Sequence, residues 1–100
     1  MKLFFTPQAE RQAMEKDAWW REHRPGVPEL FAEELAEVLN LTIGAPSVGA
    51  RYTTKSGVSF RRVLMPKTKN HVYFDFEETL GLVIVHAVWG APRGRGPALK

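Results

Sequence analysis

The chain has 100 residues, of which 44% are hydrophobic and 25% are charged, so it is long enough for one domain with one core. This composition excludes a disordered or fibrous chain, and the lack of cysteine excludes disulfides and thiolate chemistry. No apolar signal region follows Met1, and the longest apolar run, Leu82 to Trp89, is far shorter than the ~20 residues of a membrane span. We therefore expect a cytoplasmic protein that makes no membrane contact.

The formal charge of +3 is distributed unevenly along the chain. Residues 1–40 contain five Lys or Arg and eight Asp or Glu, whereas residues 41–100 contain nine and three. The second part is therefore expected to build a positive surface, which suits a phosphate-rich target or an acidic protein partner. The simpler alternative is a solvated surface without a binding role.

The first half of the chain reads as a strand followed by two helices. Lys2 to Phe5 is a short apolar stretch, and Thr6-Pro7 supplies an N-cap and a first helical position. The helix that follows is expected to run for about four turns and to end at Arg24-Pro25-Gly26. A second helix begins near Pro28 and stops before Gly44. The very short connection favours an antiparallel helical hairpin laid on a sheet.

Strands dominate the second half. Residues 44–59 show only a weak pattern and are expected to form a loop or an irregular strand. Short turns separate three strand-like segments, which are Phe60 to Met65, His71 to Phe76 and Leu82 to Trp89. The predicted fold is therefore α+β, with an N-terminal strand, an antiparallel helical hairpin and then a three-stranded antiparallel sheet. It forms a single domain over residues 1–100, of which 91–100 are a basic tail containing Gly and Pro.

Alternation along the strands predicts which side chains share a face of the sheet. Arg62 is expected to point away from Arg61, and Val85 away from both His86 and Val88. One face must pack on the helices. The other is also partly apolar, so either a partner covers it or it forms a shallow pocket carrying Arg, Tyr and His.

Three stretches of the chain resemble the RelE/ParE superfamily of type II toxin-antitoxin toxins, whose compact fold has a similar order of elements. The stretch from Phe60 to Phe74 looks like the segment of ParE-type proteins in which an arginine-bearing strand turns into an aromatic strand. Val85 to Gly90, followed by Arg93, Arg95 and Pro97, is similar to the family's last strand and its short basic motif. Phe5 to Ala9 resembles the family's start, where a strand runs into a proline-containing helix cap.

This resemblance implies a toxin, of the kind also called a plasmid stabilisation protein, that is held inactive by a cognate antitoxin in a hetero-oligomer. The C-terminal segment of the antitoxin would wrap over the toxin sheet and helices. ParE-like members inhibit DNA gyrase without a known hydrolytic reaction of their own, whereas RelE-like members cut messenger RNA in the ribosome. The resemblance leaves open whether this chain is an enzyme.

Individual side chains help to decide whether the chain is a ribonuclease or an inhibitor. A metal-free ribonuclease needs an acid, a base and a group that stabilises the charge on the phosphate. Arg62 matches the family's strand arginine, and Arg93 or Arg95 lies near its end-of-strand arginine, so Arg62 and Arg93 are the catalytic candidates if the chain is a ribonuclease. Family nucleases usually add a Tyr or His close to the C-terminus, and this chain has neither after Trp89. That absence favours an inhibitor that acts by binding.

The remaining side chains have both structural and functional interpretations. His71, Tyr73 and His86 could replace the missing acid or base, although a histidine inside an apolar strand, such as His86, is more often structural. The candidates for target binding are basic residues that a single patch would collect, namely Arg61, Arg62, Lys67, Lys69, Arg93 and Arg95. Their structural alternative is a solvated or antitoxin-facing surface.

Neither a metal site nor a cofactor site is expected, because the histidines are far apart and no Gly-rich phosphate loop joins a strand to a helix. The leading hypothesis is a toxin that inhibits DNA gyrase by binding. The alternatives are a ribosome-dependent mRNA interferase and a non-toxic relative that binds nucleic acid.

Overall fold

The structure is a computed structural model that describes residues 2–90 and 96–99. Within these residues, two α-helices and five strands follow one another, with a short 3₁₀ helix before the last strand. In order they are β1 (Lys2–Phe5), α1 (Pro7–His23), α2 (Leu30–Gly44), β2 (Ala50–Thr53), β3 (Ser59–Met65), β4 (Asn70–Glu77), η1 (Glu78–Leu80) and β5 (Leu82–Gly90). Neither of the two α-helices is long and apolar enough to cross a membrane.

The strands form one mixed sheet in the order β1-β5-β4-β3-β2, in which β1 runs parallel to β5 and the other pairs are antiparallel. The expected three-stranded antiparallel sheet is therefore wrong. The prediction includes the strand at Lys2–Phe5 but not its place in the sheet, and it gives no regular strand between α2 and β3. The helices carry the chain between β1 and the rest of the sheet, so β1 can join β5 in parallel, which a short turn cannot achieve. Ala50–Thr53, within the segment 44–59 that was expected to form a loop or an irregular strand, pairs regularly with β3 as an edge strand.

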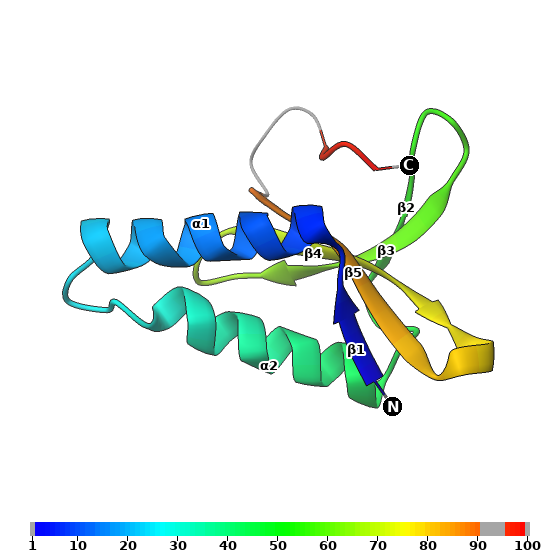
Figure 1. The fold of residues 1–100 in the computed structure, drawn as a ribbon, viewed down its shortest axis with the longest axis horizontal. Helices are drawn as coiled ribbons and strands as arrows, with labels where there is room; N and C mark the ends of the chain where they lie inside the picture. Colours follow the sequence, from blue (N-terminus) through cyan, green and yellow to red (C-terminus); the bar gives the residue numbers. More distant parts are fainter. Residues whose placement is uncertain (1, 91–95, 100) are drawn as a thin grey trace.

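Helices α1 and α2 run antiparallel along one face of the sheet (Figure 1). Thr6 caps α1 because its Oγ1 accepts a hydrogen bond from the Ala9 N–H at 3.1 Å, and Pro7 takes the first helical position. The helix ends at His23, because Pro25 prevents its continuation, and the N–H of the C-cap residue Arg24 donates to the Trp20 carbonyl at 2.9 Å.

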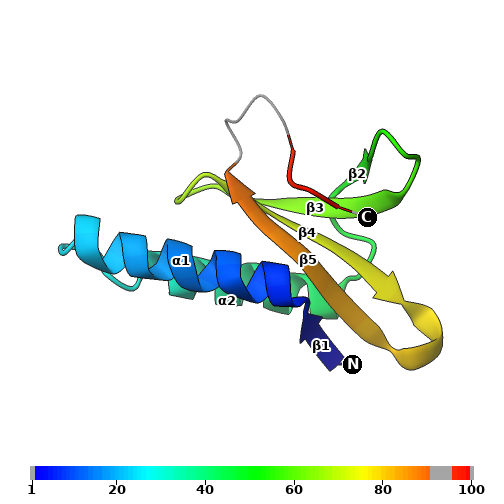
Figure 2. The ribbon, with the colours of Figure 1, turned by 45° about the horizontal axis from the view of Figure 1, so that its top comes forward.

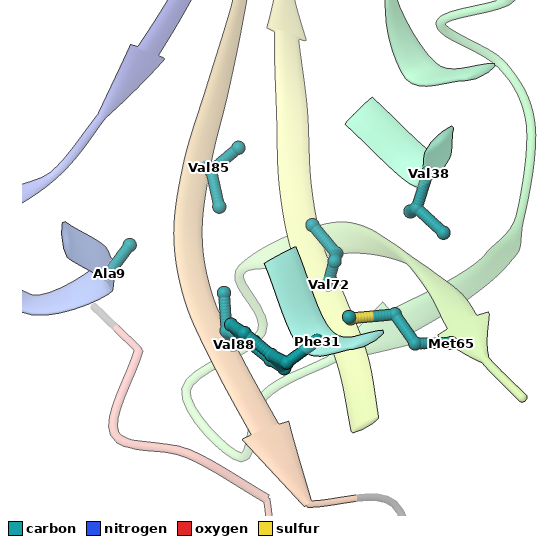
Figure 3. Packing of buried hydrophobic residues seen from close by; sticks show 7 residues of the cluster. All are labelled: Ala9, Phe31, Val38, Met65, Val72, Val85 and Val88. Atoms are coloured by element: carbon teal, nitrogen blue, oxygen red, sulfur yellow. The ribbon is translucent and has the colours of Figure 1, made fainter. Parts of the chain in front are cut away.

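The core lies between the helices and the sheet (Figure 3). It joins Ala9 of α1 and two side chains of α2 to side chains from three strands, and all of these residues are buried: Ala9, Phe31, Val38, Met65, Val72, Val85 and Val88. Each fully buried aliphatic or aromatic side chain of this kind contributes about 1.5–3 kcal/mol to folding. This packing holds the sheet against the helices.

A β-bulge in β5 changes which of its side chains face the core. Tyr73 pairs with Ala87 while its neighbour Phe74 pairs with Val85, so His86 is an extra residue in the ladder. The extra residue reverses the alternation, and Val85 and Val88 both point into the core. The prediction that they lie on opposite faces is wrong, because strict alternation assumes a regular strand.

Candidate functional site

The face of the sheet that is turned away from the helices, called here the outer face, carries most of the polar chemistry of the strands. Arg62 is the cross-strand partner of Tyr73, and these two residues point to the same side as Tyr52. One guanidinium nitrogen of Arg62 donates to Tyr73 Oη at 3.4 Å, and the guanidinium carbon lies 5.3 Å from the centre of the Tyr52 ring. The Tyr52 and Tyr73 rings meet edge to face at 5.0 Å. The strand arginine is therefore enclosed by aromatic groups.

His71 completes what we call the Arg62 cluster, made of Tyr52, Arg62, His71 and Tyr73. The His71 ring lies 6.0 Å from that of Tyr73 on the same strand face. Burial lowers the pKa of His71, and the positive charge of Arg62 lowers it further. The imidazole is therefore biased toward its neutral form, which can accept a proton. The cluster thus places a base, a phenol and a cation together.

The lowered pKa of His71 gives a first testable prediction. In Arg62→Gln the pKa of His71 is expected to rise, because the neighbouring charge is gone, but not to reach the usual histidine value, because the burial remains. An NMR titration of the imidazole measures this. Arg61→Gln removes the same charge on the opposite face of β3 and should leave the titration unchanged. An unchanged pKa in Arg62→Gln would contradict the described arrangement.

The same shift has a consequence for stability. The folded-state pKa of His71 is depressed, so between the folded and unfolded values the unfolded chain binds more protons. Protonation of His71 therefore favours unfolding. This contribution makes the chain less stable as the pH falls through the histidine range, and Arg62→Gln should weaken that dependence.

A second polar group lies on the outer face where the bulge projects His86. Its Nε2 atom is buried and lies 3.3 Å from Asp75 Oδ2, in a geometry that does not make a hydrogen bond. Its ring meets the buried Phe60 ring edge to face at 4.8 Å. His86 is thus packed between an aromatic ring and a carboxylate, and these contacts agree with the structural interpretation of this residue.

Part of the outer face, around Tyr73 and Ala87, is buried. Tyr73 is 2% exposed and Ala87 is 0% exposed, although both point away from the helices. Residues 96–99 of the C-terminal segment lie over this face (Figure 2), where Pro97 is buried and the Ala98 carbonyl accepts a hydrogen bond from Gln8 Nε2 at 3.0 Å. At the other end of this segment, a β-carbon built on Gly96 would overlap the Tyr52 hydroxyl. The segment therefore restricts access to the Arg62 cluster.

Within the part of the chain that the structure describes, the predicted basic residues do not all lie in one patch. Arg61 points to the helix side of the sheet, opposite to Arg62, because neighbours in a strand alternate. Lys67 and Lys69 lie in the turn between β3 and β4, and Lys69 precedes His71 of the cluster by two residues. Arg93 and Arg95, the other predicted members of this patch, lie outside the described residues. Side chains of adjacent residues in a strand thus lie on opposite faces of the sheet.

A buried carboxylate holds the turn that carries the two lysines. Glu34 of α2 is 3% exposed and accepts hydrogen bonds from the Lys67 N–H at 2.6 Å, the Thr68 N–H at 2.9 Å and Thr68 Oγ1 at 2.7 Å. No expectation from the sequence singled out Glu34. The spacing carried a signal, because Glu34 follows the buried Phe31 by three residues and precedes the buried Val38 by four.

Among the described residues, no group of three acidic or histidine side chains could hold a metal ion. Comparison with known proteins does not identify the site: no family model matches the chain, and no curated protein matches it.

Proposed function

We propose that this protein is a toxin of the RelE/ParE type, neutralised by a cognate antitoxin, and that it acts by binding to DNA gyrase. Support for the toxin assignment comes from the resemblance of the strand segments and the start of the chain. The observation that carries the proposal of a protein partner is an apolar groove between α1 and α2.

The groove has a volume of about 290 Å³ and lies on the helical side of the molecule. Met14, at its edge, is 67% exposed, which is unusual for a large apolar side chain. The other apolar side chains that line it are Ala13, Phe31, Ala32, Leu35, Ala36 and Leu39. Such a groove fits the apolar face of a partner helix. The acidic residues Asp17, Glu33 and Glu37 on these helices favour an antitoxin segment with basic flanks.

The contacts of Arg62 support a function in binding rather than in catalysis. A phosphate clamp needs a guanidinium whose donors face the substrate. Arg62 instead donates to Tyr73 Oη and lies over the Tyr52 ring, and residues 96–99 lie across the same face. A bound RNA would have to displace these contacts before it reached the arginine.

One observation favours the mRNA interferase as a second candidate. Arg62, His71 and Tyr73 lie on one strand face, and the pKa of His71 is lowered. A neutral imidazole can take a proton from a 2′-hydroxyl, and a guanidinium can stabilise the charge that grows on the phosphate. The cluster supplies the acid-base group that the residues after Trp89 do not.

Induced expression in bacteria without an antitoxin tests the proposal. Viable counts are expected to fall soon after induction, as they would for either kind of toxin. Arg62→Ala distinguishes the two, because a ribonuclease should lose toxicity while an inhibitor that uses a broad surface should lose little. Arg11→Ala, at an exposed position of α1, is the matched control, and circular dichroism confirms that each variant is folded. Growth without any effect would favour the non-toxic relative and overturn the proposal.

A further inference from the structure

Two arginines face each other across the outermost strand pair of the sheet. Arg51 of β2 and Arg61 of β3 are direct cross-strand partners, so their side chains point to the same side. Like charges in this position destabilise a strand pair. Among residues 2–90 and 96–99, no carboxylate forms a salt bridge with either guanidinium. The pair is therefore a concentration of positive charge without a described counter-charge.

The two arginines border a shallow pocket of about 460 Å³. Its other walls include Pro46 and Ser47 from the α2–β2 loop, Ser59 at the start of β3, and Phe76 of β4. Asp75 also borders the pocket, but it alternates to the outer face, where its carboxylate lies 3.3 Å from His86 Nε2. The carboxylate of Asp75 is thus directed away from the arginine pair.

The donors around this pocket match a phosphate better than a carboxylate. Arg61 uses one N–H to donate to the Gly49 carbonyl at 3.3 Å, which orients its guanidinium and leaves its other donors free. Arg51 and the Ser47 hydroxyl add further donors, and the Ser59 hydroxyl, which lies 3.3 Å from Thr53 Oγ1, can add one when it accepts from Thr53. The pocket therefore offers more donors than the two oxygens of a carboxylate can use. A phosphate monoester carries about −1.5 to −2 charges at neutral pH and presents three acceptor oxygens. Its charge therefore balances two guanidinium groups.

We propose that Arg51 and Arg61 form a binding site for a phosphate group, with Ser47 and Ser59 as further hydrogen-bond donors. The site lies on the opposite side of the sheet from the Arg62 cluster. It is independent of the toxin proposal, because it requires neither growth inhibition nor an antitoxin. A bound phosphate also relieves the repulsion between β2 and β3, so the ligand is expected to stabilise the fold.

Titration of the purified chain at constant ionic strength tests this site. The probes are inorganic phosphate, followed by ³¹P NMR, and a short single-stranded RNA, followed by fluorescence anisotropy. Arg51→Gln and Arg61→Gln are each expected to weaken binding by about tenfold, which corresponds to the loss of a hydrogen bond to a charged group. Arg11→Gln removes the same charge from α1 and should leave binding unchanged.

The two probes also distinguish the sources of the phosphate. Binding of inorganic phosphate at least as tight as that of the RNA supports a phosphate monoester as the ligand. Tighter binding of the RNA would contradict this match, because each phosphodiester group carries one charge and has only two non-bridging oxygens. The proposal is overturned if neither probe binds, or if Arg51→Gln and Arg61→Gln bind as well as the unchanged chain. It is also overturned if a triglutamate peptide competes as strongly as phosphate, because the pocket would then recognise carboxylates.

Discussion

Glu34→Ala is expected to lower the free energy of unfolding by about 3 kcal/mol. The carboxylate is 3% exposed and accepts three hydrogen bonds from Lys67 and Thr68. Alanine leaves two backbone N–H groups and one hydroxyl without their acceptor, and each unsatisfied buried donor costs about 1–3 kcal/mol. Because the turn lies near the surface, water can satisfy part of this loss. Denaturant-induced unfolding measures the change.

Two matched variants separate the hydrogen bonds from other effects of this substitution. Glu34→Gln keeps the volume and one acceptor oxygen but turns an NH₂ group toward a donor, so a smaller loss of about 1–2 kcal/mol is expected. Glu33→Ala removes a neighbouring, exposed carboxylate and should change stability by no more than about 0.5 kcal/mol. Equal stability of Glu34→Ala and Glu33→Ala would show that the turn does not depend on the buried carboxylate.

Gly49→Ala is expected to destabilise the protein by about 2 kcal/mol or more. Gly49 has a φ of +90°, which side-chain-bearing residues rarely adopt. A β-carbon at this position would also overlap the backbone carbonyl oxygen of Arg62, which no change of rotamer can move away. The chain enters β2 directly after this residue, so relief of the overlap must shift the β2–β3 pair.

Thermal unfolding monitored by circular dichroism measures the effect of Gly49→Ala. Gly26→Ala is the control, because a β-carbon built there meets nothing within 4 Å and its φ is not positive. This control should leave the protein at least as stable as before. If the two alanine variants had the same melting temperature, the close approach of Gly49 to β3 would be refuted.

Local chemistry made several elements predictable from the sequence. Thr6-Pro7 marks the start of α1 and Pro25-Gly26 marks its end. Both signals are local and do not depend on distant residues. The strands β3, β4 and β5 are apolar segments separated by short turns, which favour antiparallel neighbours. In each case the residues that determine the element lie within it or within a few residues of its ends.

The parts that sequence reasoning missed depend on distant contacts. Ala50–Thr53, for which a loop or an irregular strand was expected, is short and polar, and its regular strand depends on pairing with the edge of β3. The parallel pairing of β1 and the bulge at His86 are properties of the assembled sheet, with no local motif. The same applies to the pairing of Arg51 with Arg61, because alternation predicts the face of each side chain but not its partner in the next strand.

The arrangement of the candidate site was also only partly predictable from the sequence. Alternation correctly separates Arg61 from Arg62, yet the sequence does not show that Tyr52 lies against Arg62 or that residues 96–99 return to this face. These contacts join positions far apart in the chain. They decide whether the arginine is open to a ligand, and therefore which function the site suits.

The most direct test of the proposed function is pulse-labelling of DNA and protein synthesis in cells just after induction of this chain without an antitoxin. A toxin that binds gyrase predicts an early fall in DNA synthesis while translation continues. An early fall in translation with DNA synthesis intact would contradict gyrase inhibition and would make Arg62 and His71 candidates for the chemistry of mRNA cleavage.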